Sequence, residues 1–137
     1  MRSVRRLMVV AATILAFSVL APSVSAASPK AFHLEKTCAS DFLCTVQWSS
    51  FKAIPAGTDI TYAYDSSTPT LAFPTIEVRN GSTTGVCDWD QPGPTVLAIC
   101  TFGTGTGRLT QFHLVVDVTF DGTTWFWDGT YWFGNGH

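Results

Sequence analysis

The chain has 137 residues, of which 46% are hydrophobic and 13% aromatic, and its formal net charge is −2. Three of its eight basic residues are arginines within the first six positions, so the remainder carries five basic against ten acidic side chains, a net charge of −5. A balance this acidic argues against nucleic acid or anionic lipid as a partner, because both need a basic surface.

The N-terminus has the features of a secretory signal. The early arginines precede an uncharged apolar run over residues 7–21, and Val24-Ser25-Ala26 provides an A-x-A-like cleavage motif. The apolar run is shorter than the roughly 20 residues that a membrane-spanning helix needs. We therefore expect a signal peptide over residues 1–26. The remaining residues, 27–137, should form one secreted, extracellular domain with no membrane span.

The chain has four cysteines, which in a small secreted domain predict two disulfides. Three pairings are possible from the sequence. We expect Cys38–Cys44, which closes a small loop, and Cys87–Cys100, which joins neighbouring strands. A zinc site is the alternative, but the spacings of 6, 43 and 13 residues contain no C-x-x-C pair and fit no common zinc module. No metal or cofactor is expected.

Short β-rich runs separated by turn signals predict an all-β domain. In chain order, strands are expected over 31–37, 43–50, 58–65, 71–79, 82–89, 96–102, 108–120, 123–127 and 130–134. The pairs Asn80-Gly81, Asp121-Gly122 and Asp128-Gly129 are signals for two-residue hairpin turns. Regularly spaced short strands of this kind are typical of a barrel or a two-sheet sandwich.

The expected hairpins assign side chains to two faces of the C-terminal strands, because alternate residues point the same way. The core face collects Phe112, Leu114, Val116, Val118, Phe120, Trp125, Trp127 and Trp132. The opposite face holds Leu109, Gln111, His113, Val115, Asp117, Phe126, Tyr131 and Phe133. A solvated face should be mostly polar. We therefore expect His113, Asp117, Phe126, Tyr131 and Phe133 to form a ligand surface or a subunit interface.

No catalytic residue is assigned, because the sequence contains no nucleophile motif such as G-x-S-x-G and no metalloprotease motif. Two histidines share a strand face with an acid: His33 with Glu35, and His113 with Asp117. Each pair suits acid–base chemistry, although a structural hydrogen bond is the commoner role of such a pair. The glycine run 103–107 matches no phosphate-binding motif and predicts a bend between strands.

Residues 100–108 read Cys100-Thr101-Phe102-Gly103-Thr104-Gly105-Thr106-Gly107-Arg108. This segment resembles a run in secreted bacterial proteins of the allene oxide cyclase and dirigent barrel family. The resemblance covers about residues 96–120. It departs from the family pattern at Gly103-Thr104-Gly105, where the family has adjacent glycines, and at Gln111-Phe112-His113, where small residues are usual. The resemblance implies an antiparallel barrel of about eight strands, often trimeric, whose cavity holds an apolar small molecule. Two of the nine predicted strands would then be parts of one.

These observations favour a non-catalytic binding or interaction domain for a hydrophobic small molecule or a partner subunit, including a second copy of the chain. One alternative is a cyclase or isomerase that uses an apolar barrel cavity, with His113 or Asp117 pointing into it. The other alternative is a glycan-binding module that uses exposed tryptophans, of which the mature part has Trp48, Trp89, Trp125, Trp127 and Trp132.

Overall fold

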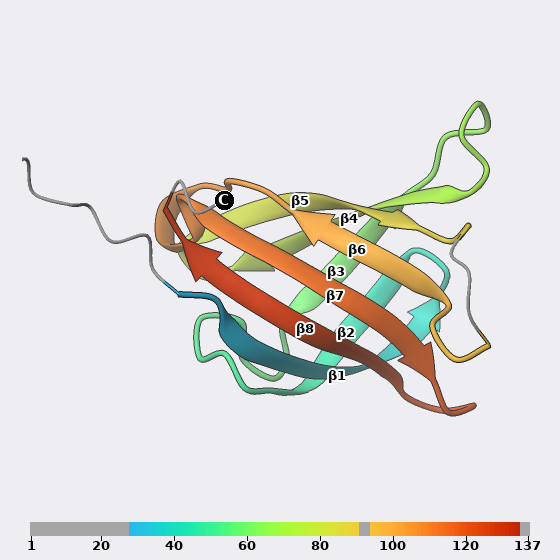
Figure 1. Cartoon of the computed structure of the whole chain (residues 1–137), viewed down its shortest axis with the longest axis horizontal. Helices are drawn as coiled ribbons and strands as arrows, with labels where there is room; N and C mark the ends of the chain where they lie inside the picture. The colour runs from blue at the N-terminus through green and yellow to red at the C-terminus, as the bar shows by residue number, and fades with distance from the viewer. Residues whose placement is uncertain (1–27, 91–93, 135–137) are drawn as a thin grey trace, which may run out of the picture.

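A computed structural model describes residues 28–90 and 94–134, so the predicted signal peptide lies outside the described residues. Eight antiparallel strands form a closed barrel, in which each strand pairs with its neighbours in the chain and β1 pairs with β8 (Figure 1). The strands are β1 Lys30–Ser40, β2 Leu43–Ser49, β3 Asp59–Ala63, β4 Leu71–Val78, β5 Gly81–Asp88, β6 Ala98–Phe102, β7 Phe112–Phe120 and β8 Trp125–Phe133. The predicted all-β barrel is confirmed, and the two-sheet sandwich is not what forms.

The last two predicted strands are one strand, β8, which continues through Asp128-Gly129 without a turn. Asp128 pairs with His33 of β1 on one side and with Asp117 of β7 on the other. A Cβ atom at Gly129 would collide with the carbonyl oxygen of Val115. The glycine therefore permits a close approach of β7 instead of a hairpin turn, and the predicted turn at this position is wrong.

Loss of that turn exchanges the faces of the last residues of β8. Tyr131 and Phe133 lie on the interior side, where their ring centroids are 6.2 and 5.6 Å from that of Phe112. Trp132 lies on the outer wall and stacks on His113 at a centroid distance of 5.3 Å. The predicted placement of Tyr131 and Phe133 beside His113, and of Trp132 in the core, is therefore wrong.

The β7–β8 hairpin keeps its predicted faces despite a different register. Phe120 pairs with Trp125, so the loop has four residues instead of two. The Asp121 carboxylate holds this loop by accepting hydrogen bonds from the backbone N–H groups of Thr123 and Thr124, both at 2.8 Å. A register change of two residues leaves every side chain on the same face. Phe112, Leu114, Val116, Val118 and Trp127 are buried as predicted.

Both predicted disulfides are present, and each joins residues that lie directly opposite each other on adjacent strands. Cys38–Cys44 links β1 to β2, and Cys87–Cys100 links β5 to β6, with a Cα–Cα distance of 3.9 Å in each case. All four cysteines lie on the interior side of the wall. The disulfides therefore reinforce the barrel from within.

The glycine run 103–107 lies at one end of the barrel and packs against the turn from β4 into β5. The backbone N–H groups of Thr106 and Arg108 donate to the carbonyl oxygens of Ser82 (2.8 Å) and Asn80 (2.6 Å) in the β4–β5 turn. A Cβ atom at Gly105 or Gly107 would collide with these same carbonyls. The run thus has a packing role at this end. Within the described residues, no helix is long and apolar enough to cross a membrane.

Candidate binding cavity

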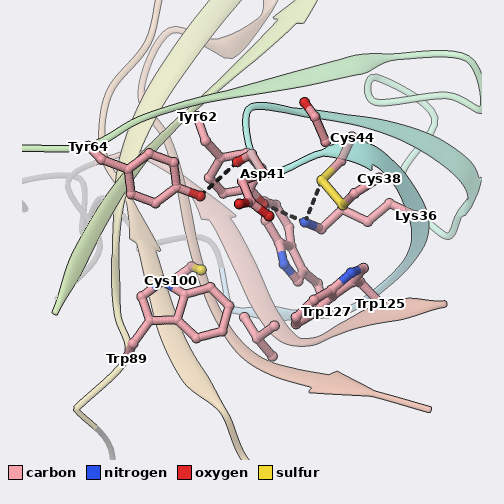
Figure 2. A pocket seen from close by; sticks show the side chains of 12 residues that line it. Lys36, Cys38, Asp41, Cys44, Tyr62, Tyr64, Trp89, Cys100, Trp125 and Trp127 are labelled. Carbon is pink, nitrogen blue, oxygen red and sulfur yellow. Dashed lines mark hydrogen bonds between the residues drawn. A yellow bond between two sulfur atoms is a disulfide. The ribbon is translucent and has the colours of Figure 1, made fainter. Parts of the chain in front are cut away.

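The opposite end of the barrel, where β1, β3, β5 and β7 finish, contains a cavity of about 310 Å³ (Figure 2). Its lining residues are Lys36, Cys38, Ser40, Asp41, Cys44, Tyr62, Tyr64, Trp89, Cys100, Val118, Trp125 and Trp127. Both disulfides border it. The volume lies at the lower end of the range of sites that take small molecules, and such sites combine apolar walls with a few polar groups.

Strand alternation places a lysine inside this cavity. Phe32, Leu34 and Lys36 are successive interior positions of β1, and Lys36 is only 3% exposed. Lys36 is absent from the predicted site because the expected hairpins, which assign side chains to faces, all lie C-terminal to β1. The signal was present: Lys36 interrupts the alternating series Phe32, Leu34 and Cys38 at a position where an apolar side chain belongs.

Aromatic rings surround the Lys36 amino group. Its Nζ atom lies 4.7 Å from the ring centroid of Tyr62, 4.8 Å from that of Trp127 and 5.8 Å from that of Trp125. It donates a hydrogen bond to the Tyr62 hydroxyl and lies 3.5 Å from Sγ of Cys44. Such cation–π contacts favour the ammonium form, and they strengthen when the cation is desolvated.

Burial opposes this preference and lowers the pKa of Lys36 to about 7. Burial also raises the pKa of Tyr62, with a further contribution from Tyr64, so the Tyr62 phenol stays protonated near neutral pH. In the described part of the chain, the two ion pairs both belong to His33, and no carboxylate lies within ion-pair distance of the Lys36 amino group. The lysine therefore sits at neutral pH between its charged and uncharged forms.

Trp127 adds an unsatisfied polar group to the same wall. The side chain is fully buried, and its indole Nε1–H has no hydrogen-bond acceptor in the described residues. Buried donors are rarely left unpaired in proteins, because the loss of solvation costs about 1–3 kcal/mol. Trp127 lines the cavity, but its Nε1 atom is enclosed, so this unpaired donor lies within the wall and not at its surface.

Exposed apolar side chains surround the entrance of the cavity. These residues, called the apolar rim below, are Phe42, Tyr64, Trp89 and Phe120, each between 37% and 62% exposed: Tyr64 and Trp89 line the cavity, Phe42 packs on Tyr64, and Phe120 stacks on Trp125. Tyr64 packs edge-on against Phe42, and its hydroxyl donates to the carbonyl oxygen of Asp41 at 2.7 Å. Apolar side chains gathered around a hollow are typical of ligand or partner sites.

Three of the five residues predicted as a ligand face lie on the outer wall, spread along the β7–β8 pair and outside this cavity. His113, Asp117 and Phe126 face outward, and neither His113 nor Asp117 lines the cavity. Tyr131 and Phe133 lie at the far end of the barrel, where they line a smaller hollow of about 190 Å³ with Phe51. The five residues therefore do not form one surface.

His33 and Glu35 form the predicted pair, but on the outer wall and with a third member. His33 Nε2 lies 3.2 Å from Glu35 Oε1, and its Nδ1 lies 2.5 Å from Asp128 Oδ1. Partial burial lowers the pKa of His33, but the two carboxylates outweigh it and raise the pKa above its usual value. Trp48, which is 50% exposed, lies beside the histidine at a ring distance of 5.5 Å.

Comparisons of the chain with models of protein families, with curated proteins and with solved structures gave no match.

Proposed function

We propose that the protein is a secreted, non-catalytic binding protein that holds a hydrophobic small molecule in the barrel cavity. The observation that carries this proposal is a cavity of about 310 Å³ walled by five aromatic side chains. These are Tyr62, Tyr64, Trp89, Trp125 and Trp127. Aromatic side chains provide large apolar contact areas, which is the main source of affinity for an apolar ligand.

The entrance of the cavity supports the same function. An apolar ligand that enters from water contacts the side chains of the apolar rim before it reaches the interior of the cavity, and these contacts are favourable because they remove apolar surface from water. The barrel is closed and is crosslinked by two disulfides on both sides of the cavity. A site that is preformed in this way loses little conformational entropy when the ligand binds.

The resemblance of residues 96–120 to the allene oxide cyclase and dirigent family also supports a ligand in the lumen, because the cavities of such barrels hold apolar small molecules.

The proposal can be tested with N-phenyl-1-naphthylamine, an uncharged dye that fluoresces strongly in apolar surroundings. Val118→Phe places a larger side chain in the cavity, and Val86→Phe adds the same volume on the outer wall, where Val86 is 40% exposed. We expect the wild type and Val86→Phe to bind the dye, and Val118→Phe to bind it at least about tenfold more weakly.

Far-UV circular dichroism should show that both variants keep the barrel. Equal dye binding by all three proteins would place the dye outside the cavity and contradict the proposal, as would no binding by the wild type. Native mass spectrometry of the mature protein from culture medium gives a second check, since a retained natural ligand adds a small mass that Val118→Phe should lose.

The outer wall favours a second candidate function, glycan binding, through one observation. Trp48 is half exposed beside His33 and the carboxylates of Glu35 and Asp128. An aromatic platform flanked by hydrogen-bonding groups suits a sugar ring. Affinity electrophoresis through gels that contain soluble cellulose or chitin derivatives should then show retardation of the wild type but not of Trp48→Ala. Equal mobility would remove this candidate.

A further inference from the structure

The cavity wall has an excess of hydrogen-bond donors where Lys36 and Tyr62 meet (Figure 2). The Lys36 amino group donates to the Tyr62 hydroxyl, which leaves the hydroxyl proton of Tyr62 available for another acceptor. A ligand that satisfies this wall must therefore supply acceptor atoms.

The charged amino group of Lys36 also lacks a carboxylate partner among the described residues. A buried ammonium group is costly unless an opposite charge compensates for it. Within the described residues, no Asp or Glu side chain lies within 4 Å of the Lys36 amino group. The wall offers one cation, and Asp41 at the entrance disfavours ligands with several negative charges. These features suit a ligand with a single negative charge.

The aromatic surroundings alone would suit a different ligand, because rings arranged around a point often bind a quaternary ammonium group. Here the point between Tyr62, Trp125 and Trp127 is already occupied by the amino group of Lys36. A cationic ligand would be repelled by the charged lysine and would leave the donors without acceptors. The occupied cage therefore favours an anion over a cation.

We propose that the ligand is an apolar monocarboxylic acid whose carboxylate binds Lys36 and Tyr62 while its apolar body contacts the aromatic walls. This proposal rests on the proposed function and specifies the class of ligand. The carboxylate supplies both the acceptors that the Lys36 and Tyr62 donors need and the counter-charge that the ammonium group needs. Hydrogen bonds that involve a charged partner are about twice as strong as neutral ones.

Binding should be coupled to protonation of the lysine. The titratable groups that border Lys36 are Tyr62 and Tyr64, both with a raised pKa, and Asp41 at the entrance. Because the pKa of Lys36 is about 7, most of the molecules carry an uncharged amine at pH 8. A bound carboxylate favours the charged form of Lys36. Binding of each carboxylate at pH 8 should therefore be accompanied by uptake of nearly one proton from the buffer.

The test compares 2-naphthoate with 2-naphthamide, which has the same ring system but no charge, by isothermal titration calorimetry. The proteins are the wild type, Lys36→Met, Tyr62→Phe and, as a matched control, Lys52→Met, since Lys52 is exposed and lies outside the cavity wall. We expect naphthoate to bind the wild type and Lys52→Met about tenfold to a hundredfold more tightly than naphthamide does.

Lys36→Met should remove this preference, and Tyr62→Phe should reduce it. Titrations at pH 8 in two buffers with different ionisation enthalpies should show proton uptake for the wild type and none for Lys36→Met. If naphthamide binds as tightly as naphthoate, or if Lys36→Met leaves naphthoate binding and proton uptake unchanged, the carboxylate proposal is wrong. The proposed function would still stand as long as N-phenyl-1-naphthylamine binds in the cavity, and it fails only if that dye does not.

Discussion

Lys36 and Trp125 lie directly opposite each other on β1 and β8, the two strands whose pairing closes the barrel. The lysine Nζ atom is 5.8 Å from the centroid of the indole ring. A charged residue thus takes an interior position at the closing seam, where an apolar side chain would be more favourable for stability alone. Under the proposed function, the amino group serves binding at a cost in stability.

Replacement of Lys36 by methionine should therefore stabilise the protein at pH 7. Methionine has a similar length and no charge to desolvate, and exchange of buried charges for apolar groups can stabilise by about 1–4 kcal/mol. Urea unfolding of both proteins at pH 7 measures the difference. A variant that is clearly less stable than the wild type would contradict this account of the lysine.

The same lysine should make stability depend on pH. Its pKa is about 7 in the folded protein and 10.5 when exposed, so between these values the unfolded chain binds one more proton than the folded chain. Stability must then rise with pH, by about 1 kcal/mol per pH unit. Urea unfolding at pH 7.5 and 9 should show this rise in the wild type. Lys36→Met should lack the rise, and a rise of equal size in the variant would assign it to another group.

The outer histidine should show the opposite dependence. Glu35 and Asp128 raise the pKa of His33 above 6.5, so its stabilising effect is complete below pH 6.5 and is lost as the pH rises through the folded value. His33→Gln should therefore be less stable than the wild type at pH 5.5 and similar to it at pH 8.5. The His33 side chain is 36% exposed, so the loss should be about 1 kcal/mol or less. A constant difference at both pH values would show that packing, and not charge, is responsible.

The two disulfides should make separate contributions to stability. Cys87 and Cys100 are 13 residues apart, and in the chain-entropy model a loop of this size contributes about 3 kcal/mol. Cys38 and Cys44 enclose a loop of 6 residues, so removal of that bond should cost less. Paired Cys→Ala variants and urea unfolding at pH 7 give both values. The reverse order would show that the Cys38–Cys44 bond also holds the wall of the cavity in place.

The interior and outer faces of the C-terminal strands should respond differently to truncation. Phe112 is fully buried and contacts Phe51, Tyr131 and Phe133, so Phe112→Ala should cost about 3–5 kcal/mol. Phe126 lies on the outer wall beside His33, and Phe126→Ala should cost about 1 kcal/mol or less. Thermal unfolding of the two variants compares these costs directly, and similar values would contradict the assignment of faces.

Much of this barrel could be predicted because the face to which each side chain points is determined locally and alternates from one residue to the next along a strand. The alternation of Phe112, Leu114, Val116 and Val118 determines which side of β7 is buried, whatever the length of the following loop. The predicted register of the β7–β8 hairpin differs from the observed one by two residues, and the predicted faces are correct because a shift of two residues leaves each side chain on the same face. The pairing of Cys87 with Cys100 was predictable for a related reason, since the predicted strands 82–89 and 96–102 that carry them are neighbours in the chain.

What could not be predicted depends on contacts between distant parts of the chain. Asp128-Gly129 has the composition of a turn, but β8 is paired on both sides and continues through it, so tertiary pairing outweighs the local signal. The cavity needs Lys36 from β1, Tyr62 from β3 and Trp127 from β8, and only the closed barrel brings these strands together. The local pattern shows that Lys36 is misplaced in a core series but not what surrounds it.

The pairing of β1 with β8 also determines where a second protein or a solid surface can be joined to the barrel. Lys30, at the start of β1, lies opposite Tyr131, near the end of β8, so the two ends of the described barrel emerge side by side (Figure 1). The cavity opens at the other end, beyond Ser40 and Phe120. A fusion partner, an immobilising tether or a short linker that joins the two ends for circular permutation would therefore leave the entrance free. The barrel is suited to conversion into a surface-mounted sensor whose cavity faces the solution.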